Sequence, residues 1–216
     1  MISKMLGRVG RQFAIHAIDP GEYRTMKVNG MKFIIHAFTA EGLGHVSAMQ
    51  AEGFFGLMKM DTLIITPTQV DLPLLSYDRV HAMGNDTLIF ELYDTQLAPA
   101  DLSGLQQAKE NAAALPDHDL GTHWYDSIKL PVSFAKKGKK AHAQAFDAAA
   151  IEYFENYLAA ARMAQPCAAA PKLEKAAVYV DGLLAHGGPS TDVFKKGIGE
   201  DKTADLFRRV LFGTQL

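Results

Sequence analysis

Asp78 is the residue of this chain best placed to do chemistry. It lies within a strand-like run from Asp71 to Val80, between two long apolar segments. A carboxylate in the middle of a strand is costly to bury unless it is solvated, paired or protonated. If the side chain faces a ligand cavity, burial raises its pKa, so that it can donate a proton to a bound molecule. If it faces water, it has no such role, and the spacing alone favours this solvent-facing placement on an antiparallel sheet.

Other chemical motifs are weak or absent. The single cysteine, Cys167, excludes a cysteine-cluster metal site, and the eight histidines show no metal-ligand spacing. There is neither a phosphate-binding glycine loop before a helix nor a Gly-x-Ser-x-Gly elbow. The basic run Lys136-Lys-Gly-Lys-Lys140 is typical of a solvated turn. It is too short, and lacks the interleaved aromatic residues, for nucleic-acid binding. We therefore predict no metal and no nucleic-acid partner.

The elements that must position Asp78 are strands first and helices later. Residues 1–28 show only a turn at Asp19-Pro-Gly21, and Val28-Asn-Gly30 predicts a hairpin turn. Five strands joined by short turns are then predicted, over 31–38, 45–52, 57–66, 74–83 and 87–93. The later segments predict helices over 99–114, 141–164, 171–185, 190–196 and 201–212, with Ser190 as a cap, and a further strand over 125–134. This order predicts an α+β fold, with helices covering an antiparallel sheet.

Composition is typical of one folded domain spanning residues 1–216. Hydrophobic residues make up 48% of the chain and charged residues 21%, which suffices for a core. The 22 basic and 24 acidic residues nearly balance, so net charge favours no polyanionic partner. No run approaches the roughly 18 apolar residues of a membrane span. Lys4, Arg8 and Arg11 interrupt the N-terminal apolar residues, which argues against a secretory signal. We expect a cytoplasmic protein without a membrane partner.

A family resemblance adds to this interpretation. Asp71-Leu-Pro73, four residues, then Asp78-x-Val80 resembles the central motif of the ferredoxin-dependent bilin reductases, which reduce linear tetrapyrroles such as biliverdin. The resemblance continues in the flanking segments and in the last helices, in the same order and at fitting distances. These segments are Asp61-Thr-Leu-Ile-Ile-Thr-Pro67, Asp86-Thr-Leu-Ile-Phe-Glu-Leu92, Val193-Phe-Lys-Lys-Gly-Ile-Gly199 and Val210-Leu-Phe212.

The resemblance implies a three-layer α/β/α sandwich around a central antiparallel sheet. It also implies reduction of a bilin by coupled single-electron and proton transfers. Electrons would come from an external ferredoxin or flavodoxin, with no bound cofactor, and the bilin would lie between the sheet and the C-terminal helices. Asp78 matches the family aspartate that takes part in proton delivery. Bilin reduction needs such an acid because the substrate becomes more basic as it gains electrons.

The chain also departs from the family pattern. Ile64 stands where many members have a pocket histidine, and Gly188, in the pair Gly187-Gly188, stands where a second acid is expected. His81 is the histidine nearest to Asp78, but its odd offset along the strand favours the opposite face of the sheet. These departures keep open a second function, a tetrapyrrole-binding protein that does not catalyse reduction. They also keep open a third, reuse of the fold for an unrelated ligand.

The resemblance suggests further ligand contacts on neighbouring strands. A family glutamate corresponds to Glu52 or, if a turn differs in length, to Gln50, and His45 lies on the same strand. Lys136 falls near a family arginine that binds a bilin propionate, where a lysine would act as a point charge without a bidentate fork. The lysine run is also a candidate docking site for an acidic ferredoxin. A charged strand end facing water is the alternative for Glu52.

Overall fold

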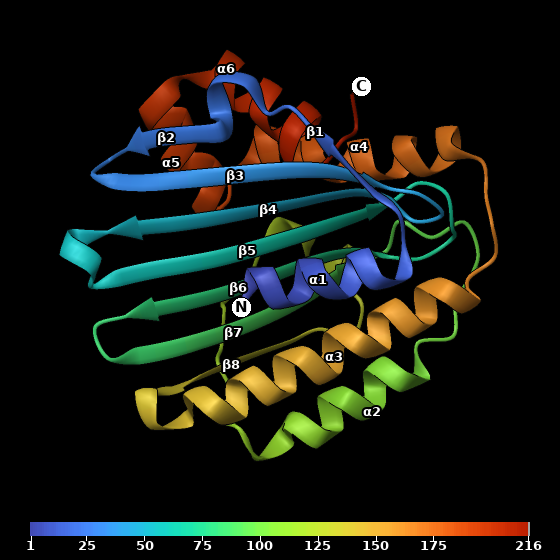
Figure 1. Ribbon diagram of the computed structural model, residues 1–216, viewed down its shortest axis with the longest axis horizontal. Coiled ribbons are helices and arrows are strands. Elements are labelled where there is room, and N and C mark those ends of the chain that lie inside the picture. Colours follow the sequence, from blue (N-terminus) through green and yellow to red (C-terminus); the bar gives the residue numbers. More distant parts are fainter. Residues whose placement is uncertain (216) are drawn as a thin grey trace.

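The computed structural model describes residues 1–215, and its centre is one antiparallel sheet (Figure 1). Within those residues the strand order is β1-β3-β4-β5-β6-β7-β8, and β2 also pairs with β3. The strands are β1 Ile15–Ile18, β2 Thr25–Val28, β3 Met31–Ala40, β4 Gly44–Gly53, β5 Met58–Pro67, β6 Leu74–Ala82, β7 Asn85–Tyr93 and β8 Phe134–Lys139. The five predicted central strands, β3 to β7, are confirmed. Each pairs with the next along the chain, as expected for an antiparallel meander.

The predicted hairpin turn at residues 28–30 is also confirmed. Asn29 and Gly30 both have positive φ angles, 50° and 78°. Two such residues form the kind of tight turn whose twist matches that of the strands it joins. The turn connects β2 to β3, so the sheet gains a short strand that the pattern of residues 1–28 did not reveal.

The prediction of a strand over 125–134 is wrong. Residues Trp124–Ile128 form a short 3-10 helix, and strand β8 starts only at Phe134. The cause lies in Asp126, whose carboxylate accepts the backbone N–H of His123 at 2.8 Å and so begins a helical turn. Alternation of apolar residues could not reveal this side-chain contact. Strand β8 instead contains most of the basic run 136–140.

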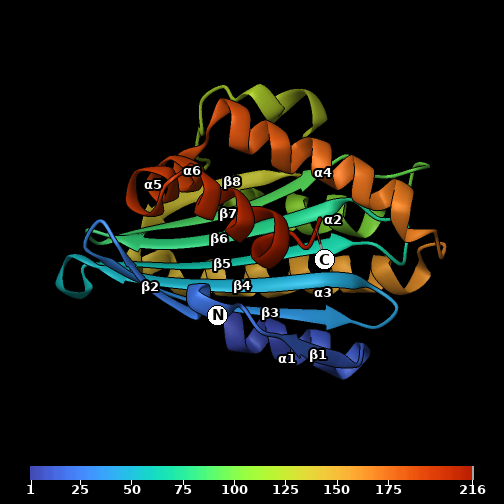
Figure 2. The same cartoon turned by 90° about the horizontal axis from the view of Figure 1, so that it is seen from above.

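Helices cover both faces of the sheet, which confirms the three-layer sandwich (Figures 1 and 2). On one face lie α1 (Ile2–Gln12), α2 (Ser103–Asn111) and α3 (Ala143–Met163). On the other lie α4 (Ala169–His186), α5 (Pro189–Ile198), α6 (Glu200–Asp205) and the helical turns of Leu206–Leu211. Ser190 is not the cap of its helix, because α5 begins at Pro189 and Gly188 takes the cap position. No helix in the described part of the chain has the length and apolarity needed to cross a membrane.

Each face of the sheet has its own hydrophobic core. Tyr77 on β6 belongs to the core under α3, together with Phe90 and Tyr153. Because successive strand residues point to opposite faces, Asp78 faces the other layer, which contains α4 and the C-terminal segment. The core of that layer includes Tyr93 and Tyr179. The alternation within β6 thus places Asp78 beneath α4.

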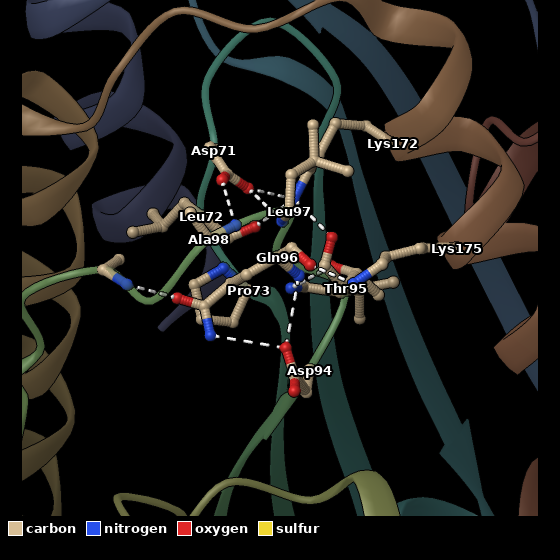
Figure 3. Close-up of polar contacts among 12 residues, drawn as sticks. Asp71, Leu72, Pro73, Asp94, Thr95, Gln96, Leu97, Ala98, Lys172 and Lys175 are labelled. Atoms are coloured by element: carbon tan, nitrogen blue, oxygen red, sulfur yellow. Dashed lines mark hydrogen bonds and ion pairs between the residues drawn. The ribbon is translucent and has the colours of Figure 1, made fainter.

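A buried ion pair ties α4 to the end of the sheet (Figure 3). Lys172 of α4 is fully buried, and its Nζ donates hydrogen bonds of 2.7 Å to the carbonyl oxygens of Leu72 and Thr95. It also pairs with the Asp71 carboxylate at 3.3 Å. Asp71 in turn accepts the backbone N–H groups of Leu97 and Ala98, each at 2.8 Å. The Asp71-Leu-Pro73 part of the motif therefore holds α4 in place over the Asp78-x-Val80 part.

Candidate functional site

A cavity of about 270 Å³ lies between the sheet and the layer of α4, α5 and the C-terminal segment. Its floor comes from alternate residues of four neighbouring strands, and its roof from the helices and from the loop before β8. The floor residues are Met49, Met60, Thr62, Ile64, Ser76, Asp78, Val80, Ile89, Glu91 and Tyr93. The roof residues, from the helices and the loop before β8, are Leu120, His123, Tyr125, Tyr179, Leu183, Gly188, Ser190, Thr191, Phe207, Leu211 and Phe212.

Asp78 is in the floor of this cavity, on the central strand β6. Thr62 of the neighbouring strand donates a hydrogen bond from Oγ1 to Oδ1 of Asp78 at 2.5 Å. Burial is the largest influence on the pKa of the Asp78 carboxyl group; the Thr62 hydrogen bond opposes it and repulsion by the Glu91 carboxylate adds to it, and together they raise the pKa to about 6. An acid with such a pKa carries a proton at weakly acidic pH and can release it near neutrality, as a general acid must.

Glu91 is a second carboxyl group in the floor, which the sequence reasoning did not identify as a site residue. It lies on β7 and is 9% exposed. The phenol of Tyr93 donates a hydrogen bond of 2.7 Å to its Oε2 atom, and the Lys129 ammonium lies 3.5 Å from Oε1. One signal was available in the sequence: Glu91 and Tyr93 are two apart in the predicted strand 87–93, a spacing that puts both side chains on one face of the sheet.

Aromatic side chains form the roof and one wall. The rings of Tyr93 and Tyr179 stack with their centroids 4.1 Å apart, and His123 stacks on Tyr125 at 4.9 Å. Burial raises the pKa of all three phenols, so they stay protonated and act as hydrogen-bond donors. Among the described side chains, the buried Nδ1 atom of His123 has no hydrogen-bond partner. The sequence did not place His123 at this cavity, because His123 precedes a 3-10 helix and no strand alternation assigns it to a face of the sheet.

Three of the residues expected at the site line this cavity: Asp78, Ile64 and Gly188. Ile64 thus presents an apolar surface at the position where many bilin reductases have a pocket histidine. Gly188 offers no side chain at the start of α5. Neither position contributes a titratable group, and the ionisable side chains of the cavity come from β6, β7, α4 and the loop before β8.

The expected residues on β4 do not line the cavity. Met49 faces it, so Gln50, the next residue on β4, points to the opposite side, where it donates a hydrogen bond of 3.0 Å to Asp61. Glu52 shares that side and is exposed, opposite Lys59 on the neighbouring strand. His45 is buried on the same strand, and its Nε2 atom lies 2.8 Å from the carbonyl oxygen of Val210.

His81 and Lys136 also lie outside the cavity lining. His81 is on the far face of β6, as its odd offset from Asp78 implies, and pairs with the buried Asp86. Lys136 is buried on β8, and its Nζ atom contacts the Asp117 carboxylate at 2.6 Å and the carbonyl oxygen of Leu115 at 3.1 Å. Both side chains already have partners within the chain.

The raised pKa of Asp78 predicts a specific dependence of stability on pH. Well below pH 4 the group is protonated in both the folded and the unfolded state; well above pH 6 it is ionised in both, and the folded state bears the desolvation cost. Raising the pH from 4 to 7 should therefore lower the free energy of unfolding of the native protein by about 2 kcal/mol relative to Asp78→Asn. Urea unfolding of both proteins at several pH values measures this difference, and parallel curves would contradict the raised pKa.

The structure thus defines a class of protein: an α/β/α sandwich with an acid-containing cavity between its antiparallel sheet and its C-terminal helices. Among solved structures it is similar to that of phytochromobilin synthase from tomato in complex with biliverdin, with a TM-score of 0.81. The match covers 99% of this chain and 82% of that chain at 15% sequence identity. Phytochromobilin synthase is a ferredoxin-dependent bilin reductase, so the resemblance found in the sequence is confirmed at the level of fold. No family model and no curated protein matches the sequence.

Proposed function

We propose that this protein binds a linear tetrapyrrole in the cavity and reduces it, with Asp78 as the proton donor. Electrons would arrive one at a time from an external ferredoxin or flavodoxin, without a resident cofactor. The observation that carries the proposal is the buried carboxyl group of Asp78 in the floor of an aromatic cavity, where burial raises its pKa. The fold is that of a protein solved in complex with biliverdin.

The chemistry of the cavity suits this reaction. Each electron that a bilin accepts makes its nitrogen and carbon atoms more basic. The Asp78 O–H bond then breaks as an N–H or C–H bond forms on the substrate, and the Asp78 carboxylate regains a proton from hydronium, which leaves water. Thr62 holds the carboxyl group in one orientation through its hydrogen bond. The stacked rings of Tyr93 and Tyr179 offer flat apolar surfaces to a conjugated ligand.

The cavity by itself is small for a ligand of this class, so such a ligand would have to extend beyond it. A volume of about 270 Å³ is close to the lower end of small-molecule sites, which span about 300–1,000 Å³. A second hollow of about 190 Å³ shares Glu91 and Leu120 with the first, so the two adjoin. A propionate reaching Lys136 would have to displace Asp117, with which this lysine is already paired.

An absorbance titration with biliverdin tests the ligand class, and adding ferredoxin with a reducing system then tests the reaction. We expect a shifted bilin spectrum on binding, followed by new absorbance bands that grow with time. A shifted spectrum that does not change under reducing conditions would instead identify a non-catalytic tetrapyrrole-binding protein. Absence of binding at micromolar biliverdin would overturn both functions and indicate an unrelated ligand.

A further inference from the structure

Asp78 and Glu91 are diagonal neighbours on one face of the sheet. In the pairing of β6 with β7, Asp78 lies opposite Ile89 and Glu91 lies opposite Ser76. Diagonal cross-strand residues on one face are typically about 7–8 Å apart, within reach of long side chains. Both side chains line the same cavity. Two carboxyl groups so placed repel each other when both are ionised, which favours a proton on one of them.

The contacts of Glu91 determine which of the two takes the proton. Glu91 accepts the Tyr93 phenol at Oε2, and Lys129 lies 3.5 Å from Oε1. Burial lowers the pKa of Lys129, but its ion pairs with Asp126, at 2.6 Å, and with Glu91 outweigh this effect and raise the pKa overall. The two oxygens of the Glu91 carboxyl group thus have a phenol donor and an ammonium group beside them, the partners that a carboxylate accepts. Asp78 has Thr62 and no cation among the described residues, so the proton belongs on Asp78.

Among the other groups that face Asp78 across the cavity, the phenols are neutral, and His123 does not contribute to the raised pKa of Asp78. β7 adds Tyr93, the loop before β8 adds His123 and Tyr125, and α4 adds Tyr179. Burial raises the pKa of these phenols, so they are neutral. The cavity residues from α5 and the C-terminal segment carry no ionisable side chain; they are Gly188, Ser190, Thr191, Phe207, Leu211 and Phe212. Within the described lining, Glu91 is the carboxyl neighbour of Asp78.

We infer that Glu91 is a positioning residue that keeps the proton on Asp78, with Lys129 and Tyr93 fixing Glu91 as the charged partner. The use of this proton in reduction rests on the proposed function, whereas the coupling of the two carboxyl groups does not. After Asp78 donates its proton, two carboxylates face each other in the cavity. Their repulsion favours transfer of a proton from hydronium to Asp78, which restores the acid and leaves water.

The test uses Glu91→Gln, which keeps the shape of the side chain and an acceptor for Tyr93 but removes the charge. The Asp78 carboxyl group is titrated by carbon NMR in the ligand-free protein, and its signal is assigned by its absence in Asp78→Asn. We expect the midpoint to fall by about 1 pH unit in Glu91→Gln. The matched control is Glu110→Gln, which removes the same charge from an exposed site on α2 and should leave the midpoint unchanged.

An unchanged midpoint in Glu91→Gln, or an equal shift in the Glu110→Gln control, would overturn the inference whether or not the protein reduces bilins. If Glu91→Gln fails to fold, Glu91→Met fills a similar space and should give the same downward shift. With biliverdin and the reducing system present, the alkaline limb of the rate–pH profile should move down by the same amount. A shifted NMR midpoint without any turnover would reject the proposed function but retain the coupling.

Discussion

Replacing Asp78 by asparagine should leave biliverdin binding nearly unchanged and lower the rate of reduction by at least about 100-fold, the usual contribution of a positioned general acid. Asparagine fills the same space and can still accept the Thr62 hydrogen bond, so the cavity keeps its shape. It has no acidic proton to give when the ligand gains an electron. Absorbance titration measures binding, and spectra under ferredoxin-coupled reduction measure the rate.

The variant should also stall after the first electron, leaving a bilin radical that electron paramagnetic resonance can detect. A matched control is Asp61→Asn on the neighbouring strand β5. Asp61 faces the other side of the sheet, where it pairs with the N-terminal ammonium at 3.2 Å. This control should reduce bilin at the native rate. Full turnover by Asp78→Asn would remove Asp78 from the mechanism, even if the ligand class proved correct.

Replacing Lys172 by methionine should destabilise the protein by about 3–5 kcal/mol, the range measured when one partner of a buried ion pair is removed. The change leaves the Asp71 carboxylate without its cation and the carbonyl oxygens of Leu72 and Thr95 without their donor (Figure 3). Urea unfolding followed by circular dichroism measures the difference. Since α4 supplies Tyr179 to the cavity, bilin binding should weaken as well.

Lys175→Met is the control for this prediction. Lys175 lies one turn along α4 and also donates to a backbone carbonyl, that of Gln96, but its side chain is exposed. Its loss should therefore change the free energy of unfolding by less than about 1 kcal/mol, as for most exposed positions. If both variants lose equally little stability, apolar packing alone holds α4 on the sheet, and the Asp71–Lys172 pair has no special role.

The central sheet could be read from the sequence because its information is local. Alternation of apolar and polar residues identified strands β3 to β7, and the Asn29-Gly30 turn follows from two residues that tolerate positive φ. The same alternation put Asp78 and His81 on opposite faces. The order of strands and helices was enough to predict the α+β class.

Only the tertiary structure decided which side chains share the cavity with Asp78. Glu91, His123 and Tyr179 come from a strand, a loop and a helix that are distant along the chain. Lys136 looked free to bind a ligand, but it is paired with Asp117 across a loop. Asp126 begins a helical turn at Trp124–Ile128, so the strand predicted over 125–134 does not form there. Periodicity reports the face on which a residue lies, whereas its partner depends on packing between layers, which no local pattern encodes.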